Sequence, residues 1–235
     1  ESARDAVVLN ADDELCISML PFLFTPRICL VSMQSGVEEL AAIQGSMDCF
    51  CILERVRSSN WLVLYDGDRR LPVIEAEQIP ATFGGLAGFN ICNALHAIAA
   101  CYLMGIDLET VKEGLRTFRM SFESTPGRLN FYEGHPFTVI MDYAHNADGI
   151  GKLSAFVDQL KISGKKLLMY QARGDREDKN IKHFAAAAAP YFDHYVCRTH
   201  PVYTGPDEQK VLILMQDALL ASGVDKRQIT ITTDP

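Results

Sequence analysis

Short apolar runs alternate with longer amphipathic runs in the second half of the chain. The apolar runs have the length and the β-branched content of strands, and the amphipathic runs repeat apolar residues with the period of a helix. We therefore predict strands at residues 137–141, 166–171, 194–197 and 229–232, and helices at residues 147–160, 180–189 and 208–222. This order predicts an α/β fold with a mostly parallel sheet, helices on both faces, and ligand contacts after the strand ends.

The first half of the chain begins with apolar runs and continues with two helical patterns. The predicted strands lie at residues 6–9, 28–31, 49–56 and 62–65, and the last two are joined by a short polar segment at 57–60 that suits a hairpin. The first helix is predicted at residues 90–104 and ends before Gly105. Asp107 is expected to cap a second helix that runs through Phe118.

Charge and composition exclude several classes of function. The chain carries a net charge of -8, which argues against nucleic acid or an anionic membrane as its main partner. No apolar run is long enough to span a membrane, and no leader for secretion is visible. The seven cysteines include no Cys-x-x-Cys pair, which predicts free thiols in the cytoplasm. We predict no metal ligands, and the catalytic residues remain unassigned.

A polar segment directly follows the predicted strand at 137–141. It contains Asp142, His145 and Asn146 and precedes a helix, which is where an open α/β sheet binds its ligand. Asn146 is expected to cap the helix, and the amide groups behind it would favour an anion. The alternative is an ordinary turn in which Asp142 and Asn146 only satisfy backbone donors.

Two asparagines lie close together at the start of the predicted helix 90–104. Asn90 and Asn93 are three residues apart, so both lie on one side of the first turn. Asn90 following Gly88 is a good N-cap, and capping alone would explain it. Asn93 lies inside an otherwise apolar helix, where a carboxamide requires a polar partner.

Six short motifs occur in an order that resembles the Mur ligase family, most closely the Mur-like half of cyanophycin synthetases. They are Asn10-Ala11-Asp12-Asp13, Ile79-Pro80 with Gly84-Gly85, Asn90-Ile91-Cys92-Asn93, Pro126-Gly127-Arg128, Asp142-Tyr143-Ala144-His145-Asn146, and Gly174-Asp175-Arg176. The resemblance implies that residues 1–125 are the C-terminal part of a central ATP-binding α/β domain. It implies that residues 126–235 are a Rossmann-like C-terminal domain.

The resemblance also implies an activity, its cofactors and its substrates. It implies an ADP-forming ligase that uses ATP and Mg²⁺ to join a carboxylate and an amino acid through an acyl phosphate. No Gly-x-x-x-x-Gly-Lys-Ser/Thr loop occurs in the chain, so we expect a piece of a longer enzyme that binds ATP weakly and is inactive alone. Mg²⁺ would then be held mainly by residues outside this piece.

The resemblance further assigns residues to the ligands. Asn90 and Asn93 would contact adenine, Arg128 the phosphates, and Asp142 and His145 the ribose, with Asn146 beside them. Asp175, Arg176 and His200 would lie near the incoming substrate. The loop at 198–208 departs from the arginine-containing loops of the family. The identity of the amine substrate therefore cannot be inferred from any branch of the family.

Other functions remain open at this point. The chain would also suit a catalytically incomplete nucleotide-binding or regulatory module, or a peptidoglycan-type or folate-type ligase on the same scaffold. A half domain would leave a sheet edge unpaired, which would allow the chain to form homo-oligomers.

Overall fold

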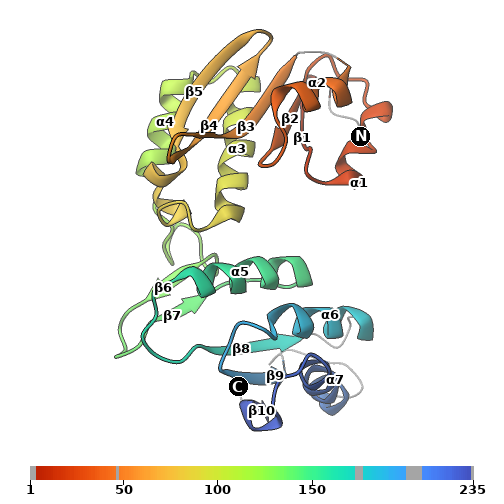
Figure 1. The fold of residues 1–235 in the computed structure, drawn as a ribbon, viewed down its shortest axis with the longest axis vertical. Coiled ribbons are helices and arrows are strands. Elements are labelled where there is room, and N and C mark those ends of the chain that lie inside the picture. Colours follow the sequence, from red (N-terminus) through yellow and green to blue (C-terminus); the bar gives the residue numbers. More distant parts are fainter. Residues whose placement is uncertain (1–3, 46–47, 173–176, 200–207, 234–235) are drawn as a thin grey trace. The chain divides into compact units, whose positions relative to one another are not determined.

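The computed structural model describes residues 4–45, 48–172, 177–199 and 208–233. The chain divides into two compact units, Glu1–Phe131 and Tyr132–Pro235 (Figure 1). Each unit builds its own hydrophobic core, and each is therefore described by itself. The assignment of the first unit to a central ATP-binding domain remains a prediction.

A five-stranded sheet in the order β1-β2-β3-β4-β5 forms the centre of the first unit. Its strands are β1 (Val7–Asn10), β2 (Ile28–Ser32), β3 (Cys49–Val56), β4 (Ser59–Asp66) and β5 (Arg69–Glu75). The first three strands are parallel, and β3, β4 and β5 are antiparallel. The four strands predicted from the sequence are confirmed, and β3 and β4 form the expected hairpin.

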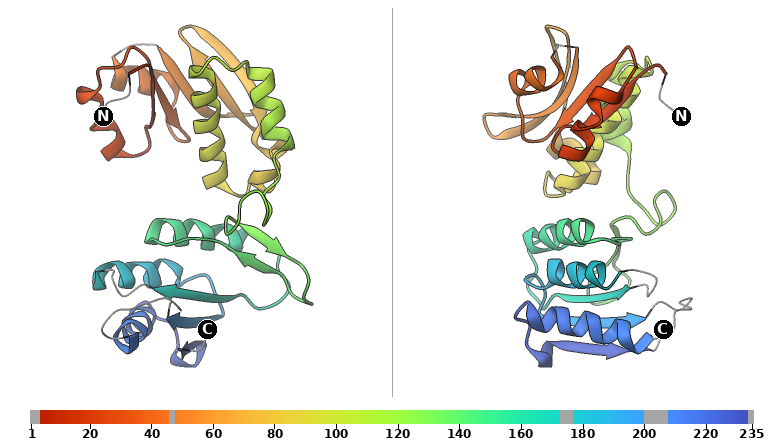
Figure 2. Two further views of the ribbon diagram at one scale, coloured as in Figure 1. Left: turned by 180° about the vertical axis from the view of Figure 1, so that it is seen from behind. Right: turned by 90° about the vertical axis from the view of Figure 1, so that its right-hand side faces the viewer.

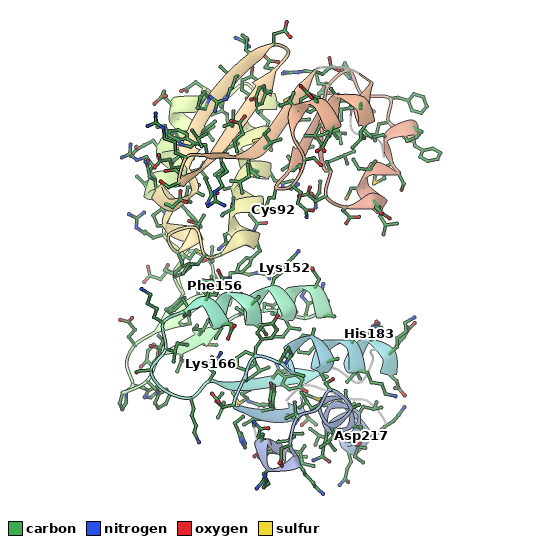
Figure 3. The ribbon with its side chains drawn as sticks, viewed as in Figure 1. Cys92, Lys152, Phe156, Lys166, His183 and Asp217 are labelled. Carbon is green, nitrogen blue, oxygen red and sulfur yellow. The ribbon has the colours of Figure 1, made fainter. Side chains whose placement is uncertain are left out.

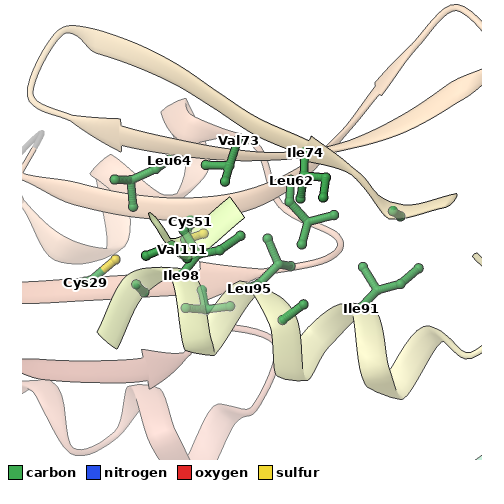
Figure 4. Close-up of a cluster of buried hydrophobic side chains, with 14 of the residues drawn as sticks. Cys29, Cys51, Leu62, Leu64, Val73, Ile74, Ile91, Leu95, Ile98 and Val111 are labelled. Atoms are coloured by element: carbon green, nitrogen blue, oxygen red, sulfur yellow. The ribbon is translucent and has the colours of Figure 1, made fainter. Parts of the chain in front are cut away.

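Helices cover both faces of this sheet. The helices of the first unit are α1 (Glu14–Ile17), α2 (Val37–Gln44), α3 (Gly88–Leu103) and α4 (Leu108–Thr117), and its 3-10 turns are η1 (Leu20–Phe22), η2 (Ala76–Gln78) and η3 (Pro80–Thr82). Ile91, Leu95 and Ile98 point from α3 to one face of the sheet (Figure 4). Leu40 of α2 packs against Leu30 and Phe50 on the other face.

Strand β5 and helix α2 are the longest elements of the first unit that the sequence prediction lacks; the short helix α1 and the 3-10 turns were not predicted either. Strand β5 begins with two arginines and contains Pro72, features that weaken a strand pattern but suit the edge of a sheet. Helix α2 is only eight residues long and buries a single residue, Leu40, so its apolar periodicity is weak. The predicted cap Asp107 is confirmed, because its side chain accepts a hydrogen bond from the Thr110 amide.

The second unit is an α/β unit with a three-stranded parallel sheet in the order β10-β9-β8. Its strands are β8 (Leu167–Ala172), β9 (His194–Thr199) and β10 (Ile229–Thr232), and its helices are α5 (Ala147–Gln159), α6 (Asp178–Ala188) and α7 (Glu208–Ala221), with the 3-10 turn η4 (Lys226–Gln228). The short strands β6 (Asn130–Tyr132) and β7 (Val139–Met141) form a separate two-stranded sheet. The predicted α/β class is confirmed.

Two details of the second unit differ from the prediction. Strand β7 pairs with β6 and does not join the parallel sheet. Strand β6 precedes β7 by only a few residues of sequence, so the two strands can pair across a short loop. The helices were expected on both faces, but α6 lies between α5 and α7 in one layer (Figure 2). The strand order proceeds in one direction from β8 to β10, and right-handed crossovers then place successive helices on the same face.

The apolar side chains of β8 are divided between a covered and an exposed face. Tyr170 packs in the core with α6 and α7. Leu167 and Met169 point the other way and are 59% and 58% exposed. Among the described residues, no helix is long and apolar enough to cross a membrane.

All seven cysteines are free, as predicted, and they differ in access to solvent. Burial raises the pKa of the Cys51 and Cys197 thiols, and hydrogen bonding to Cys49 together with burial raises that of Cys29. Thiolate is the reactive form, so these thiols should react slowly with Ellman's reagent in the folded chain. We expect three thiols, Cys16, Cys92 and Cys101, to react first, and the other four only on unfolding. Rapid labelling of all seven thiols without denaturant, resolved by mass spectrometry, would contradict this.

Candidate functional site

The N-terminus of α3 carries the two asparagines singled out from the sequence. Asn90 is not the N-cap, so that expectation is wrong: the helix begins two residues earlier at Gly88, and Ala87 is the cap. Asn90 is half-buried and donates hydrogen bonds to the Ala81 carbonyl at 2.7 Å and to Met120 Sδ at 3.5 Å. Its carboxamide therefore joins α3 to η3 and to the segment after α4.

Asn93 lies on the side of α3 that faces away from the sheet. It is exposed, whereas Ile91 and Leu95 on the same helix are buried. Its Nδ2 donates to Asn90 Oδ1 at 3.2 Å, so the polar partner expected for it is Asn90. Cys92, which lies between the two asparagines, is labelled at this end of α3 in Figure 3.

Asp12 joins the carboxyl end of β1 to that of β2. It belongs to the Asn10-Ala11-Asp12-Asp13 motif, to which no role was assigned from the sequence. Its carboxylate accepts hydrogen bonds from Ser32 Oγ at 2.5 Å and from the Met33 amide at 2.8 Å. Ser32 is fully buried and accepts from two further amides, those of Gln34 and Ser35. A side chain placed at Gly88 would meet the Met33 methyl at 3.9 Å, so these strand ends lie beside the start of α3.

The Pro126-Gly127-Arg128 segment is a tight loop held by Asn130. Gly127 and Leu129 adopt left-handed backbone conformations with φ of 71° and 47°. Asn130 Oδ1 accepts from the Gly127 amide at 2.7 Å, and its Nδ2 donates to the Arg128 carbonyl at 3.2 Å. Sequence reasoning missed Asn130, although a carboxamide within Leu-Asn-Phe is a signal for a buried polar contact. The loop leaves Arg128 exposed.

In the second unit, the segment after β7 is a compact turn. Asp142 Oδ1 accepts from the Ala144 amide at 2.8 Å. His145 Nδ1 lies 3.2 Å from the Tyr143 carbonyl, which can only accept, so Nδ1 carries the hydrogen and Nε2 is left for another partner. Asp142, His145 and Asn146 are all exposed, so each is accessible to a ligand.

Asn146 caps α5 as predicted. Its Oδ1 accepts from the Gly149 amide at 2.7 Å, and Asp148 in the first turn pairs with Lys152. Ala147 occupies the first helical position and the turn is kept. The local contacts of Asn146 are thus those of a cap.

Replacing Asn146 by alanine removes this cap, and we expect the second unit to lose about 1 kcal/mol of unfolding free energy. Asn146→Ser should retain most of it, because a serine hydroxyl also caps a helix. Urea unfolding followed by far-UV circular dichroism measures both. Equal losses for the two variants would show that the side chain stabilises the unit in another way.

The predicted site residues fall into three sets. Asn90 and Asn93 contact each other in the first unit, which also holds Arg128. Asp142, His145 and Asn146 share one turn in the second unit. Asp175, Arg176 and His200 lie outside the described residues. Within the described ranges, no group of three or more His, Cys, Asp or Glu side chains could hold a metal ion.

Comparison with known proteins identifies a family for the C-terminal part of the chain. Residues 127–230 match the family described as Mur ligase, glutamate ligase domain. The C-terminal part of the chain belongs to the Mur ligase family. The resemblance predicted from the sequence is therefore confirmed.

Similarity to curated proteins extends beyond the Mur ligase domain. The chain is 30% identical over 94% of its length to a cyanophycin synthetase of Geminocystis herdmanii, and 36% identical over 81% to one of a Nostoc species. It spans 24% and 20% of these two relatives. A murein peptide ligase from Psychrobacter arcticus shares the fold, with a TM-score of 0.63 over 98% of this chain and 44% of that one, at 17% identity. The predicted Rossmann-like class is confirmed.

Proposed function

We propose that this chain is part of an ATP-dependent, ADP-forming ligase that joins a carboxylate to an amino acid through an acyl phosphate, in the manner of a cyanophycin synthetase. The observation that carries the proposal is the 30% identity to a cyanophycin synthetase over 94% of the chain, because it includes both units. The chain spans about a quarter of that relative, so the activity belongs to the whole protein.

The exposed polar groups of each unit support a nucleotide as ligand. Asn93 presents a carboxamide, and adenine offers a donor and an acceptor that a carboxamide can match. Arg128 presents a cation suited to phosphate. Asp142 and His145 present an acceptor and an imidazole suited to sugar hydroxyls. Bound ATP would supply the phosphoryl group that activates the carboxylate.

Magnesium is part of the proposed reaction, but the described residues do not fit a site for it. No acidic or mixed cluster among them could hold a cation. We propose that Mg²⁺ is held by other parts of the enzyme. The assignment of Asp175, Arg176 and His200 to the substrate also stays a proposal.

An ADP-release assay on the complete gene product tests the function. Purified protein is supplied with ATP and Mg²⁺ and screened against amino acids and carboxylate acceptors, with product detected by mass spectrometry. We expect ADP release that requires both substrates, and no turnover by residues 1–235 alone. Absence of ADP release with every substrate pair, together with measurable nucleotide binding, would favour a regulatory nucleotide-binding module instead.

We also propose a cytoplasmic location and small-molecule partners. The seven free cysteines support a reducing compartment. Self-association is tested by sedimentation of the purified chain at several concentrations.

A further inference from the structure

A thiol and an imidazole lie side by side on helix α3. His96 follows Cys92 by four residues, so the two side chains project from the same side of the helix. Cys92 Sγ lies 3.7 Å from His96 Nδ1. Both residues are half-buried, so each keeps part of its surface open to solvent. The ligase reaction proposed above uses neither group.

The helix backbone fixes which ring nitrogen carries a hydrogen. His96 Nδ1 lies 2.8 Å from the Cys92 carbonyl oxygen, which can only accept, so Nδ1 carries the hydrogen. The same N–H group faces the sulfur, and Cys92 Sγ therefore acts as an acceptor. A charged acceptor forms a stronger hydrogen bond than a neutral one, so this contact favours the thiolate over the thiol. Thiolate is the form that attacks electrophiles.

The other six cysteines lack this arrangement. Cys101 is also half-buried and lies on α3, but the residues four positions before and after it are Ala97 and Gly105, neither of which has a side-chain donor. Cys16 is half-buried as well, and it lies far in sequence from the first histidine of the chain. The remaining thiols are buried, and they are Cys29, Cys49, Cys51 and Cys197.

We propose that Cys92 is a modification site for small disulfides, and that His96 is the positioning residue that activates it. The Cys92 thiolate attacks one sulfur of a disulfide. A bond forms between Cys92 Sγ and that sulfur, the original S–S bond breaks, and the other half leaves as a thiolate that takes up a proton from water. Cys92 is oxidised and the disulfide is reduced, so the exchange needs no further oxidant. The modification does not depend on the proposed ligase function.

The adduct would have a consequence for the ligase. Cys92 belongs to the end of α3 that the proposed function gives to the nucleotide. A group as large as glutathione attached there would cover this end of the helix and block ADP reversibly. This consequence, unlike the modification itself, rests on the proposed function.

The test measures reaction rates at single thiols in the chain of residues 1–235. The chain is treated with excess oxidised glutathione without denaturant, and peptide mass spectrometry gives the modified fraction of each cysteine against time. Cys101, on the same helix, is the internal reference. We expect Cys92 to react about tenfold faster than Cys101, because one hydrogen bond to a charged group changes an equilibrium by at least that factor.

Two variants of His96 separate activation from access. His96→Ala removes the donor and opens space around the sulfur, so the rate at Cys92 should fall by about tenfold although access improves. His96→Asn keeps an N–H donor near the place of Nδ1 and should retain the native rate within about threefold. A merely structural role of His96 would act in the opposite direction, because a loosened helix exposes Cys92 and Cys101 and raises both rates.

The outcomes decide the modification site without reference to the nucleotide. Equal rates at Cys92 and Cys101 in the native chain would overturn the proposal, and so would a native rate in His96→Ala. If His96→Asn is as slow as His96→Ala, the N–H donor is not what activates Cys92, and the role given to His96 is wrong. If a variant does not fold by circular dichroism, the ratio of the two native rates decides.

The effect on ADP is measured separately, by ¹⁵N NMR titration of the chain before modification, after it, and after reduction with dithiothreitol. Cys92→Ser treated in the same way is the control, and its ADP binding should not change. Equal ADP binding by the unmodified and the modified chain would show that the adduct does not block the nucleotide. Absence of ADP binding by the unmodified chain would count against the nucleotide site, whereas the rates would still decide the modification of Cys92.

Discussion

Replacing Leu95 by alanine is expected to lower the unfolding free energy of the first unit by about 3 kcal/mol, because it leaves a cavity in a close-packed core. Leu95 is 0% exposed and belongs to the cluster between α3 and the five-stranded sheet. The second unit has its own core, so its stability should be unchanged. We therefore expect the first unit to unfold at a lower denaturant concentration than in the native chain, and the second unit to unfold at the same concentration.

The chain offers a specific probe for this measurement. Its single tryptophan, Trp61, lies in β4 of the first unit, so its fluorescence follows the unfolding of that unit. Ala97→Ser, at an exposed position of the same helix, is the matched control and should cost no more than about 0.5 kcal/mol. If Leu95→Ala and Ala97→Ser shift the Trp61 transition equally, Leu95 does not pack as described.

Replacing Asn130 by aspartate is expected to cost about 3 kcal/mol at neutral pH, because a buried charge would face a carbonyl oxygen. Asn130 is 1% exposed, and its Nδ2 donates to the Arg128 carbonyl. Oδ1 of the new residue could still accept from the Gly127 amide. At neutral pH the change therefore replaces one hydrogen bond by a repulsive contact between two oxygens and leaves the other hydrogen bond in place.

The cost should depend on pH with a definite sign. Burial raises the folded-state pKa of the introduced carboxyl above its unfolded value of about 4. A raised pKa means that the variant is closest to the native stability at low pH, where the protonated carboxyl can donate to the carbonyl. The deficit should then grow as the pH rises through the folded-state pKa.

The measurement is the difference in unfolding free energy between the variant and the native chain across acidic and neutral pH. Asn180→Asp, at an exposed position of α6, adds the same charge and should change stability by less than about 0.5 kcal/mol. A deficit that does not vary with pH would mean that residue 130 is hydrated and that the loop is held in some other way.

Much of the fold follows from the sequence because its elements are long and bounded by clear signals. Strand β3 was predicted with its observed bounds, and Asp107 and Asn146 were recognised as caps because each precedes an apolar repeat. Strand β5 and helix α2 were missed because one contains Pro72 and the other buries a single leucine. The single helix layer of the second unit depends on strand order, which periodicity does not encode.

The candidate site could be predicted as residue types but not as contacts. Asn90 and Asn93 were found as a pair, but the contacts of Asn90 with Ala81 and Met120 depend on how η3 and the segment after α4 pack beside α3. Asn90 was expected to cap α3 because Gly88 precedes it, whereas the helix extends two residues further back. Asn130 and Ser32 were missed because burial, not residue type, gives them their roles.

The one-sided packing of β8 has a practical consequence for engineering the chain. Tolerance to substitution along this strand should have a period of two residues. Positions 168 and 170 should reject polar side chains, because both pack with the helices. Positions 167 and 169 should accept threonine, and the double variant should remain soluble at higher concentration than the native chain, with the same far-UV spectrum.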